Sequence, residues 1–288
     1  MKAAPFDYIE AGSADEAVFL LGEAGTDAAV LAGGQTLMPL LALRMATPTV
    51  LVDINPADDM AGIARTGEGV RIGARTRQAA ALRDPIVARH LPVLGEALSH
   101  VGHYQTRARG TVGGSIALGE PAAEQPAVAV ALGASIELRS SRGTRQVPAR
   151  EFYLGPYATT RADDEVVIAI HFPEWPASSH IVFHEVARRR GDFALVGLVM
   201  LLDVRDARVE RAGIAWFGMG PTPVAATTAE QALTGAAIAD IDPRELAHLA
   251  LAEVEPSEDL HASAHYRRTV AARIFERRFR TLAGGITA

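Results

Sequence analysis

The run Ala32-Gly33-Gly34-Gln35-Thr36-Leu37 continues a short apolar segment, Ala28–Ala32, and a second glycine stretch, Arg109-Gly110-Thr111-Val112-Gly113-Gly114-Ser115, comes later in the chain. Consecutive glycines permit positive φ and close backbone approach, so several N–H groups can converge on phosphate oxygens. Hydroxyls such as those of Thr36 and Thr111 can add hydrogen bonds. Either stretch alone could be only a turn, but the pair predicts one pyrophosphate held from two sides.

Neither glycine stretch has the GxGxxG or GxxxxGK[ST] spacing, which disfavours a Rossmann dinucleotide fold and a P-loop. The segments around the first stretch predict a compact unit of alternating strands and helices, consistent with α/β architecture. Its parts are strands at Phe6–Ile9, Ala28–Ala32 and Val50–Asp53, a helix opened by a capping box at Ser13 and Glu16, and a helical turn over Met38–Leu43.

The rest of the chain continues this alternation. In the middle we expect strands at Val70–Ala74, Ser135–Arg139, Gln146–Val147 and Glu165–Phe172, helices at Pro92–His100 and from an N-cap at Thr76 to Leu82, and a loop over Arg107–Ser115. Two prolines and small polar residues predict a linker over Pro173–Ser179. Beyond it, strands at Ile181–Val186, Ala194–Asp203 and Val209–Phe217 precede helices at Thr228–Leu233, Pro243–Val254 and Ala262–Leu282, an order that predicts a sheet covered on one face by helices.

Composition excludes several kinds of chemistry. The 288 residues include no cysteine, which excludes disulfides, cysteinyl iron–sulfur clusters, Cys-ligated zinc and thiol nucleophiles within this chain. With 34 acids against 28 bases the formal net charge is −6, which argues against nucleic acid as the main partner. Apolar runs are too short for a membrane span, and no signal-peptide core is present. We therefore expect a cytoplasmic protein.

Two glutamates follow the second glycine stretch, in Glu120-Pro121-Ala122-Ala123-Glu124. An ionised carboxylate is an acceptor and could bind ribityl or ribose hydroxyls. The simpler expectation from the residues alone is a solvated pair of acids at a helix start, where the helix dipole favours them.

The histidines do not predict a metal site. His100 and His103 are three residues apart but have no carboxylate partner of a facial triad, and His261 and His265 share a helical face without a third ligand. A GxSxG motif is absent, so Ser-His-Asp catalysis has no support. We predict no catalytic residue and no metal ligand.

Two basic clusters remain. Arg188, Arg189 and Arg190 form a basic turn, and the last predicted helix carries Arg267, Arg268, Arg273, Arg277, Arg278 and Arg280, with Tyr266, Val270 and Ile274 as its predicted apolar stripe. The net charge favours a solvated face or a protein interface over nucleic acid for this helix. A protein partner would offer carboxylates for bidentate guanidinium contacts.

The ordered set of motifs resembles the FAD-binding medium subunits of the molybdenum hydroxylase family, which includes carbon monoxide dehydrogenase and xanthine dehydrogenase. The resemblance rests on the two glycine stretches and the acid pair, and continues through Gly191-Asp192-Phe193-Ala194-Leu195-Val196 and Gly218-Met219-Gly220-Pro221-Thr222-Pro223. It covers essentially the whole chain, in order.

The resemblance implies an α+β fold of the vanillyl-alcohol-oxidase (PCMH) type. Two FAD-binding subdomains, residues 1–54 and 55–174, would precede a C-terminal sheet-and-helix domain, residues 178–288. The first stretch would contact the FAD pyrophosphate, and the second stretch would contact the other side of the phosphates and the ribityl chain. The two acids would contact the flavin, and Phe193 would lie beside the isoalloxazine. The implied cofactor-binding residues are Leu31, Ala32, Gly33, Gly34, Gln35, Thr36, Leu37, Met38, Val101, Thr111, Val112, Gly113, Gly114, Ser115, Glu120, Glu124 and Phe193.

The resemblance also implies an oxidoreductase function by electron relay. Substrate would react at a molybdopterin–molybdenum centre in a large subunit, [2Fe–2S] clusters in a small subunit would carry the electrons, and FAD in this chain would pass them to an external acceptor. The assembly would be a heterotrimer or a dimer of heterotrimers. Because this chain has no cysteine, its clusters would have to lie on a partner. The alternatives are a stand-alone FAD oxidase or dehydrogenase that binds its own substrate, and a scaffold without flavin.

Overall fold

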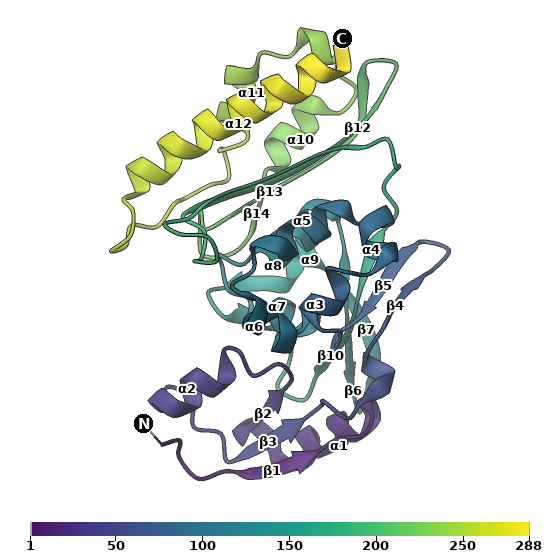
Figure 1. Ribbon diagram of the computed structural model, residues 1–288, viewed down its shortest axis with the longest axis vertical. Helices are drawn as coiled ribbons and strands as arrows, with labels where there is room; N and C mark the ends of the chain where they lie inside the picture. The colour runs from purple at the N-terminus through teal and green to yellow at the C-terminus, as the bar shows by residue number, and fades with distance from the viewer. Residues whose placement is uncertain (1, 288) are drawn as a thin grey trace.

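A small parallel sheet forms the N-terminal end of the computed structural model, which describes residues 2–287 (Figure 1). Strands β1 (Asp7–Glu10), β2 (Ala28–Leu31) and β3 (Val50–Asp53) pair in the order β1-β3-β2, with helices α1 (Ala14–Ala24) and α2 (Leu37–Leu43) between them in sequence. The Ser13 hydroxyl accepts a hydrogen bond from the Glu16 N–H at 3.2 Å and so begins α1. The Glu16 carboxylate accepts the N–H of Gly12 at 2.7 Å, so both predicted capping residues act at this helix start.

The middle of the chain builds an antiparallel sheet in the order β4-β5-β10-β6-β7. Its strands are β4 (Ile63–Arg65), β5 (Gly69–Gly73), β6 (Ser135–Ser140), β7 (Gly143–Pro148) and β10 (Val166–Pro173). Between β7 and β10 in the chain, β8 (Tyr153–Gly155) and β9 (Ala158–Thr159) form a separate two-stranded sheet. The helices of this part are α3 (Gln78–Ala81), α4 (Pro85–His90), α5 (Pro92–His100), α6 (Tyr104–Arg109), α7 (Val112–Leu118), α8 (Glu124–Leu132) and α9 (Ala149–Phe152). Short 3₁₀ turns occur at Gly25–Asp27, Asp58–Met60 and Ile238–Asp240.

The second glycine stretch is a helix start, so the loop predicted over Arg107–Ser115 is wrong. Helix α6 ends at Arg109, and Thr111 caps α7 by accepting the N–H of Gly114 at 3.0 Å. Glycine is needed at 113 for packing, because a Cβ there would lie 2.3 Å from the Cβ of Ala74. Thr76 is also not the N-cap of α3; its hydroxyl donates to the Gly62 carbonyl at 3.1 Å, and Arg77 occupies the cap position.

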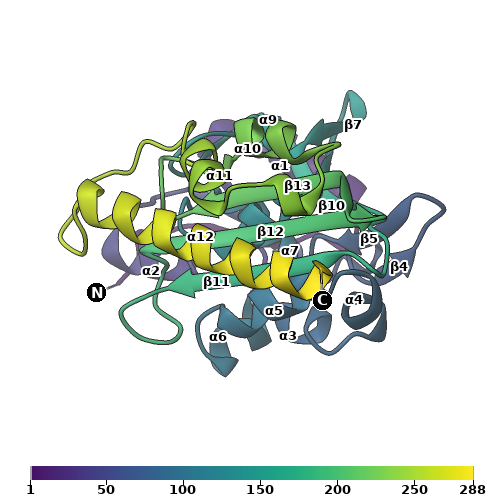
Figure 2. The same ribbon diagram turned by 90° about the horizontal axis from the view of Figure 1, so that it is seen from above.

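The C-terminal part is a sheet with helices on one face, as predicted. Strands β11 (His180–Val186), β12 (Val196–Arg205), β13 (Arg208–Phe217) and β14 (Val224–Ala225) pair in chain order, and α10 (Thr227–Leu233), α11 (Pro243–Leu249) and α12 (Ala264–Thr287) cover one face (Figures 1 and 2). Along β12, Leu198 and Met200 enter the core beneath these helices, whereas Val199 and Leu201 enter the central core on the opposite face. This alternation is that of a strand buried on both faces.

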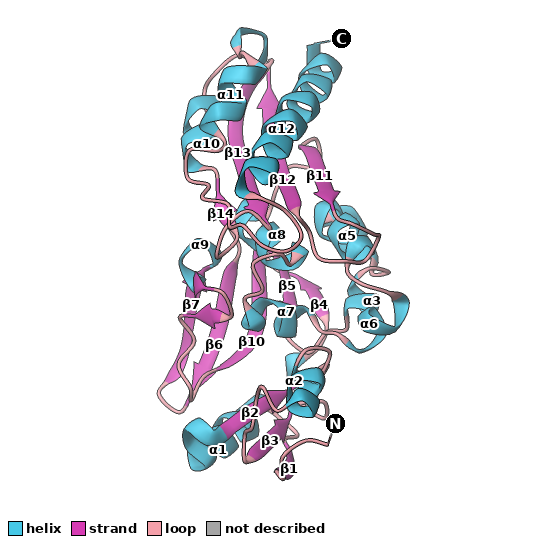
Figure 3. Ribbon diagram, turned by 90° about the vertical axis from the view of Figure 1, so that its left-hand side faces the viewer, coloured by secondary structure: helices cyan, strands magenta, loops and turns pink. Residues whose placement is uncertain are grey.

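Helix α8 lies between the middle and C-terminal sheets (Figure 3), and all its residues are buried. The segment predicted as a linker is packed against its end, because Trp175 is buried and its indole N–H donates to the Leu132 carbonyl at 3.1 Å. The apolar stripe predicted for the last helix is confirmed at Val270 and Ile274, which are partly buried against the core beneath the helices, and is wrong at Tyr266. Tyr266 is exposed, and the buried side chains of α12 include Ala271, Phe275 and Phe279. None of the described helices has the length and apolar character that a membrane crossing requires.

Candidate functional site

A cavity of about 420 Å³, here called the central cavity, lies between the first glycine stretch and helix α7. It gathers nearly all the predicted cofactor-binding residues: Ala32, Gly33, Gly34, Gln35, Thr36, Leu37, Val101, Thr111, Gly113, Gly114, Ser115, Glu120, Glu124 and Phe193. Three of the predicted residues do not line this cavity. Leu31 belongs to strand β2, Met38 is exposed on α2, and Val112 is fully buried in the core.

The two glycine stretches touch each other directly. A Cβ added to Gly33 would lie 2.5 Å from the carbonyl oxygen of Arg109 and 2.8 Å from the Cα of Gly110. Gly34 has φ of +69°, a conformation that residues with a Cβ rarely adopt. Glycine at both positions therefore brings the end of β2 against the turn between α6 and α7.

The stretches differ in the backbone donors that they leave available. Within the described residues, the N–H groups of Gly33, Gly34, Gln35 and Thr36 have no hydrogen-bond acceptor. At the second stretch the amides of residues 110 and 112–115 are used internally; for example, the Gly113 N–H donates to the Ala74 carbonyl at 2.8 Å. Within the described residues, only the Thr111 N–H of residues 110–115 has no acceptor. The first stretch thus has the run of consecutive free donors that a pyrophosphate needs. The second can offer hydroxyls and close approach, not the set of amides that the sequence suggested.

Asn55 and Arg77, which no sequence motif marks, hold the two stretches together. The Asn55 side-chain amide donates to the Ala32 carbonyl at 2.9 Å, and the Arg77 guanidinium donates to the Asn55 side-chain oxygen and to the Arg109 carbonyl. Burial, with Arg109 and Arg75 nearby, lowers the pKa of Arg77. A signal was available, since Asn55 follows the carboxyl end of strand β3, where α/β sheets place their ligand-binding groups.

The acid pair is buried, so the expectation of solvated carboxylates is wrong. Only 5% of Glu124 is exposed, and burial raises its pKa to about 8, opposed by a backbone hydrogen bond and assisted by Glu185 and Glu120. The Glu120 carboxylate accepts the Tyr157 hydroxyl and, at 3.1 Å, the N–H of Ala122. Near neutral pH, Glu124 is therefore mostly protonated and can both donate and accept a hydrogen bond inside the cavity.

Other lining residues had no motif to reveal them. The side-chain oxygen of Gln78 is buried without a hydrogen-bond partner among the described residues. Arg161, Asp163 and Glu165 reach the cavity from the segment before β10. An orphaned acceptor, free amides and neighbouring hydroxyls fit a ligand with phosphates and many hydroxyls, as FAD is.

Phe193 lies at the cavity with 63% of its surface exposed. The turn before it rests on another loop, because a Cβ at Gly191 would lie 2.8 Å from the Gly102 carbonyl oxygen. His100 lies 3.3 Å from the Glu185 carboxylate, not in a ligand set. Within residues 2–287, no three His, Asp or Glu side chains are grouped so as to hold a metal ion.

Comparison with known proteins covers nearly the whole chain. Residues 4–175 match the family described as FAD binding domain in molybdopterin dehydrogenase, and residues 181–282 match the CO dehydrogenase flavoprotein C-terminal domain. The first match contains every lining residue of the central cavity except Phe193, which lies in the second.

Curated relatives and solved structures agree. The chain is 36% identical to 6-hydroxypseudooxynicotine dehydrogenase complex subunit alpha of Paenarthrobacter nicotinovorans, covering 96% of this chain and 94% of that protein. It is 36% identical to the carbon monoxide dehydrogenase medium chain of Hydrogenophaga pseudoflava, covering 94% and 95%. The reconstituted CO dehydrogenase from Oligotropha carboxidovorans contains a chain with TM-score 0.94 and 33% identity, covering 99% of both chains. Quinoline 2-oxidoreductase from Pseudomonas putida 86 contains a chain with TM-score 0.91 and 34% identity, and the match covers 99% of both chains.

Proposed function

This chain belongs to the family of FAD-binding medium subunits of the molybdopterin dehydrogenases, and we propose that it relays electrons within such an enzyme. The electrons would come from [2Fe–2S] clusters of a small subunit, after substrate has reacted at a molybdopterin centre in a large subunit. They would leave through FAD in this chain to an external acceptor. The observation that carries the proposal is the central cavity, where free backbone donors and buried hydrogen-bonding side chains meet.

FAD would supply the redox chemistry, and the chain's own residues would bind and orient it. The free N–H groups of Gly33 to Thr36 would hold the pyrophosphate, with Arg77 and Asn55 fixing the backbone that presents them. Glu124, mostly protonated near neutral pH, would donate to or accept from a ribityl hydroxyl. Phe193 would limit water at the isoalloxazine. No side-chain acid, base or nucleophile takes part, so we assign no catalytic residue.

The composition supports the partner assignment. A chain without cysteine has no thiolate to ligate an iron–sulfur cluster, so a cluster that feeds this FAD must lie on another polypeptide. We propose two FAD-binding subdomains at residues 1–54 and 55–174, a C-terminal CO-dehydrogenase-flavoprotein-like domain at 178–288, and a cytoplasmic dimer of heterotrimers.

Purification of the tagged chain from its source cells tests this proposal. We expect a cysteine-rich small subunit and a molybdopterin-containing large subunit to co-purify with it. Removing FAD from that complex should stop reduction of the external acceptor, while substrate still reduces the clusters. A flavin-loaded chain that purifies alone and oxidises a substrate unaided would instead establish the stand-alone oxidase.

A further inference from the structure

The six arginines predicted for the last helix fall into two groups. Arg267, Arg268 and Arg280 have partners inside the chain: the Arg267 guanidinium donates to the Leu195 carbonyl at 2.6 Å, Arg268 binds the Val254 carbonyl, and Arg280 pairs with Glu276 at 2.6 Å. The other three, Arg273, Arg277 and Arg278, form no ion pair with a carboxylate in the described part of the chain.

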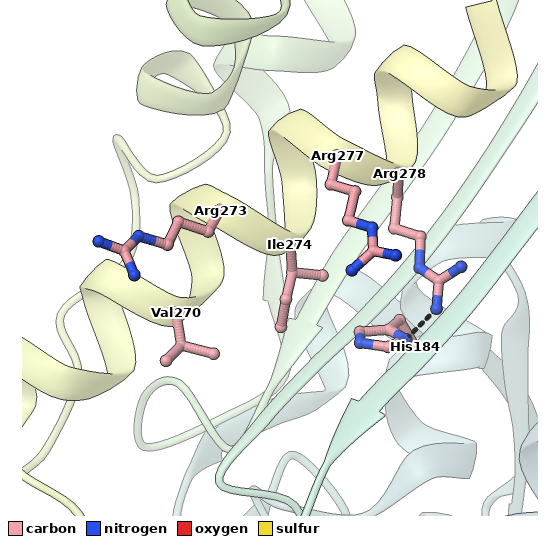
Figure 4. A pocket seen from close by; sticks show the side chains of 6 residues that line it. All are labelled: His184, Val270, Arg273, Ile274, Arg277 and Arg278. Carbon is pink, nitrogen blue, oxygen red and sulfur yellow. Dashed lines mark hydrogen bonds between the residues drawn. The ribbon is translucent and has the colours of Figure 1, made fainter.

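These three side chains line one groove of about 230 Å³ between α12 and strand β11, here called the arginine groove (Figure 4). Its other lining residues are His184, Val270 and Ile274. Arg278 donates to Nδ1 of His184 at 2.6 Å, so this contact uses an uncharged imidazole and neutralises nothing. Burial, with Arg278 and Arg277 nearby, lowers the pKa of His184, which favours the neutral ring.

The groove therefore concentrates positive charge on a chain whose net charge is −6. The positive charge of Arg278 acts on the Glu96 carboxylate of α5. Desolvation raises the pKa of Glu96 overall, although the charge of Arg278 acts to lower it. Glu96 forms no ion pair with any of the three arginines among residues 2–287. Guanidinium groups without carboxylates fit bidentate recognition of an anionic ligand.

We propose that the arginine groove binds an acidic segment of a partner subunit, with carboxylates on Arg273, Arg277 and Arg278 and an apolar side chain against Val270 and Ile274. Two features favour a polypeptide over a free anion. The half-buried Val270 and Ile274 add an apolar strip that phosphate cannot use. Strand β11 is the edge strand of its sheet, so the groove runs along the edge of the sheet, where an extended segment can lie. The inference rests on the proposed function only in taking the partner from the same assembly.

Charge reversal tests the groove directly. The measurement is the dissociation constant between the FAD-loaded chain and its co-purifying subunits. Because close charge pairs at interfaces are strongly coupled, we expect Arg273→Glu with Arg277→Glu to raise it at least about tenfold. Arg280→Glu on the same helix, outside the groove, is the matched control and should change it less than about twofold. Arg273→Gln with Arg277→Gln replaces the reversal if that variant fails to retain FAD.

The cysteine-free chain permits a second readout. A single thiol introduced as Ile274→Cys and coupled to a photocrosslinker should join the groove to a segment of a partner rich in Asp or Glu, and Arg280→Cys should not. Unchanged assembly of the groove variants, equal weakening by the control, or binding of inorganic phosphate alone with assembly unaffected would each overturn the inference. A chain that lacks FAD and partners altogether would refute the proposed function; a normal FAD-loaded assembly that ignores these substitutions refutes only the groove.

Discussion

Gly33 packs against the backbone of Arg109 so closely that a Cβ at position 33 would lie 2.5 Å from the Arg109 carbonyl oxygen. This contact joins residues that are far apart in sequence and brings together the two glycine stretches, which both line the central cavity. Together with the Arg77 bridge, it fixes where the free amides of the first stretch point.

Gly33→Ala should force the stretches apart. Overpacking of this kind costs about 1–3 kcal/mol, so the affinity for FAD should fall by about one to two orders of magnitude. Titration of the apo-chain with FAD measures the change. Gly67→Ala is the control, because nothing lies within 4 Å of a Cβ there. Wild-type affinity in Gly33→Ala would show that the contact does not shape the site.

Glu124 should make the stability of the FAD-free chain depend on pH. Burial raises its pKa to about 8, so the folded chain holds a proton that the unfolded chain releases. The stability that this proton contributes is fully present below the unfolded pKa of about 4.3 and is lost as pH rises through the folded pKa. The free energy of unfolding of the wild type should therefore decrease over this pH range. The free energy of unfolding of Glu124→Gln should decrease less over the same range.

Urea unfolding at several pH values measures this dependence. Glu185, whose pKa burial raises to about 7, titrates in the same window, so Glu124→Gln combined with Glu185→Gln should give the flattest profile. Glu151→Gln, at an exposed position of α9, should follow the wild type. Parallel profiles for Glu124→Gln and the wild type would contradict the assignment.

Arg150 connects the middle of the chain to its C-terminal helices. Its guanidinium binds the buried carboxylate of Glu230 at 2.6 and 2.8 Å, and Glu230 also accepts the Ile214 N–H at 2.7 Å. Arg150→Ala leaves that carboxylate short of partners and should cost about 1–3 kcal/mol of unfolding free energy. Arg142→Ala removes an exposed pair with Asp164 and should cost less than about 1 kcal/mol. Equal losses in denaturant titrations would refute this account.

Phe193 should affect access to the flavin and not the fold. Because 63% of its surface is exposed, Phe193→Ala should leave the thermal midpoint nearly unchanged. We expect the variant to retain FAD while iodide quenches flavin fluorescence more strongly than in the wild type. Unchanged quenching would place Phe193 away from the ring.

Local patterns predicted the elements whose residues interact with near neighbours in sequence. Val50–Asp53 and Pro92–His100 occur as β3 and α5, and the capping pair at Ser13 and Glu16 begins α1. Nearly all the predicted site residues meet at one cavity because the glycine stretches carry a backbone requirement that is visible in sequence.

The errors arise where distant contacts decide the structure. Gly113 needs its missing Cβ because of Ala74, and burial of Glu124 depends on elements packed around α8. On the last helix, Phe275 and Phe279 lie on the fully buried face. Val270 and Ile274 of the predicted stripe are only partly buried and also line the arginine groove, and Tyr266 is exposed. Arg77 and Asn55 were missed because their role exists only once the two stretches are in contact.

The FAD content of the purified chain tests the central claim most directly. Flavin absorbance after denaturation, divided by protein concentration, should give one FAD per chain, either as purified or after incubation with FAD. Gly33→Ala should lower that ratio, and Gly67→Ala should not. A folded, colourless wild-type chain that takes up no added FAD would contradict the account.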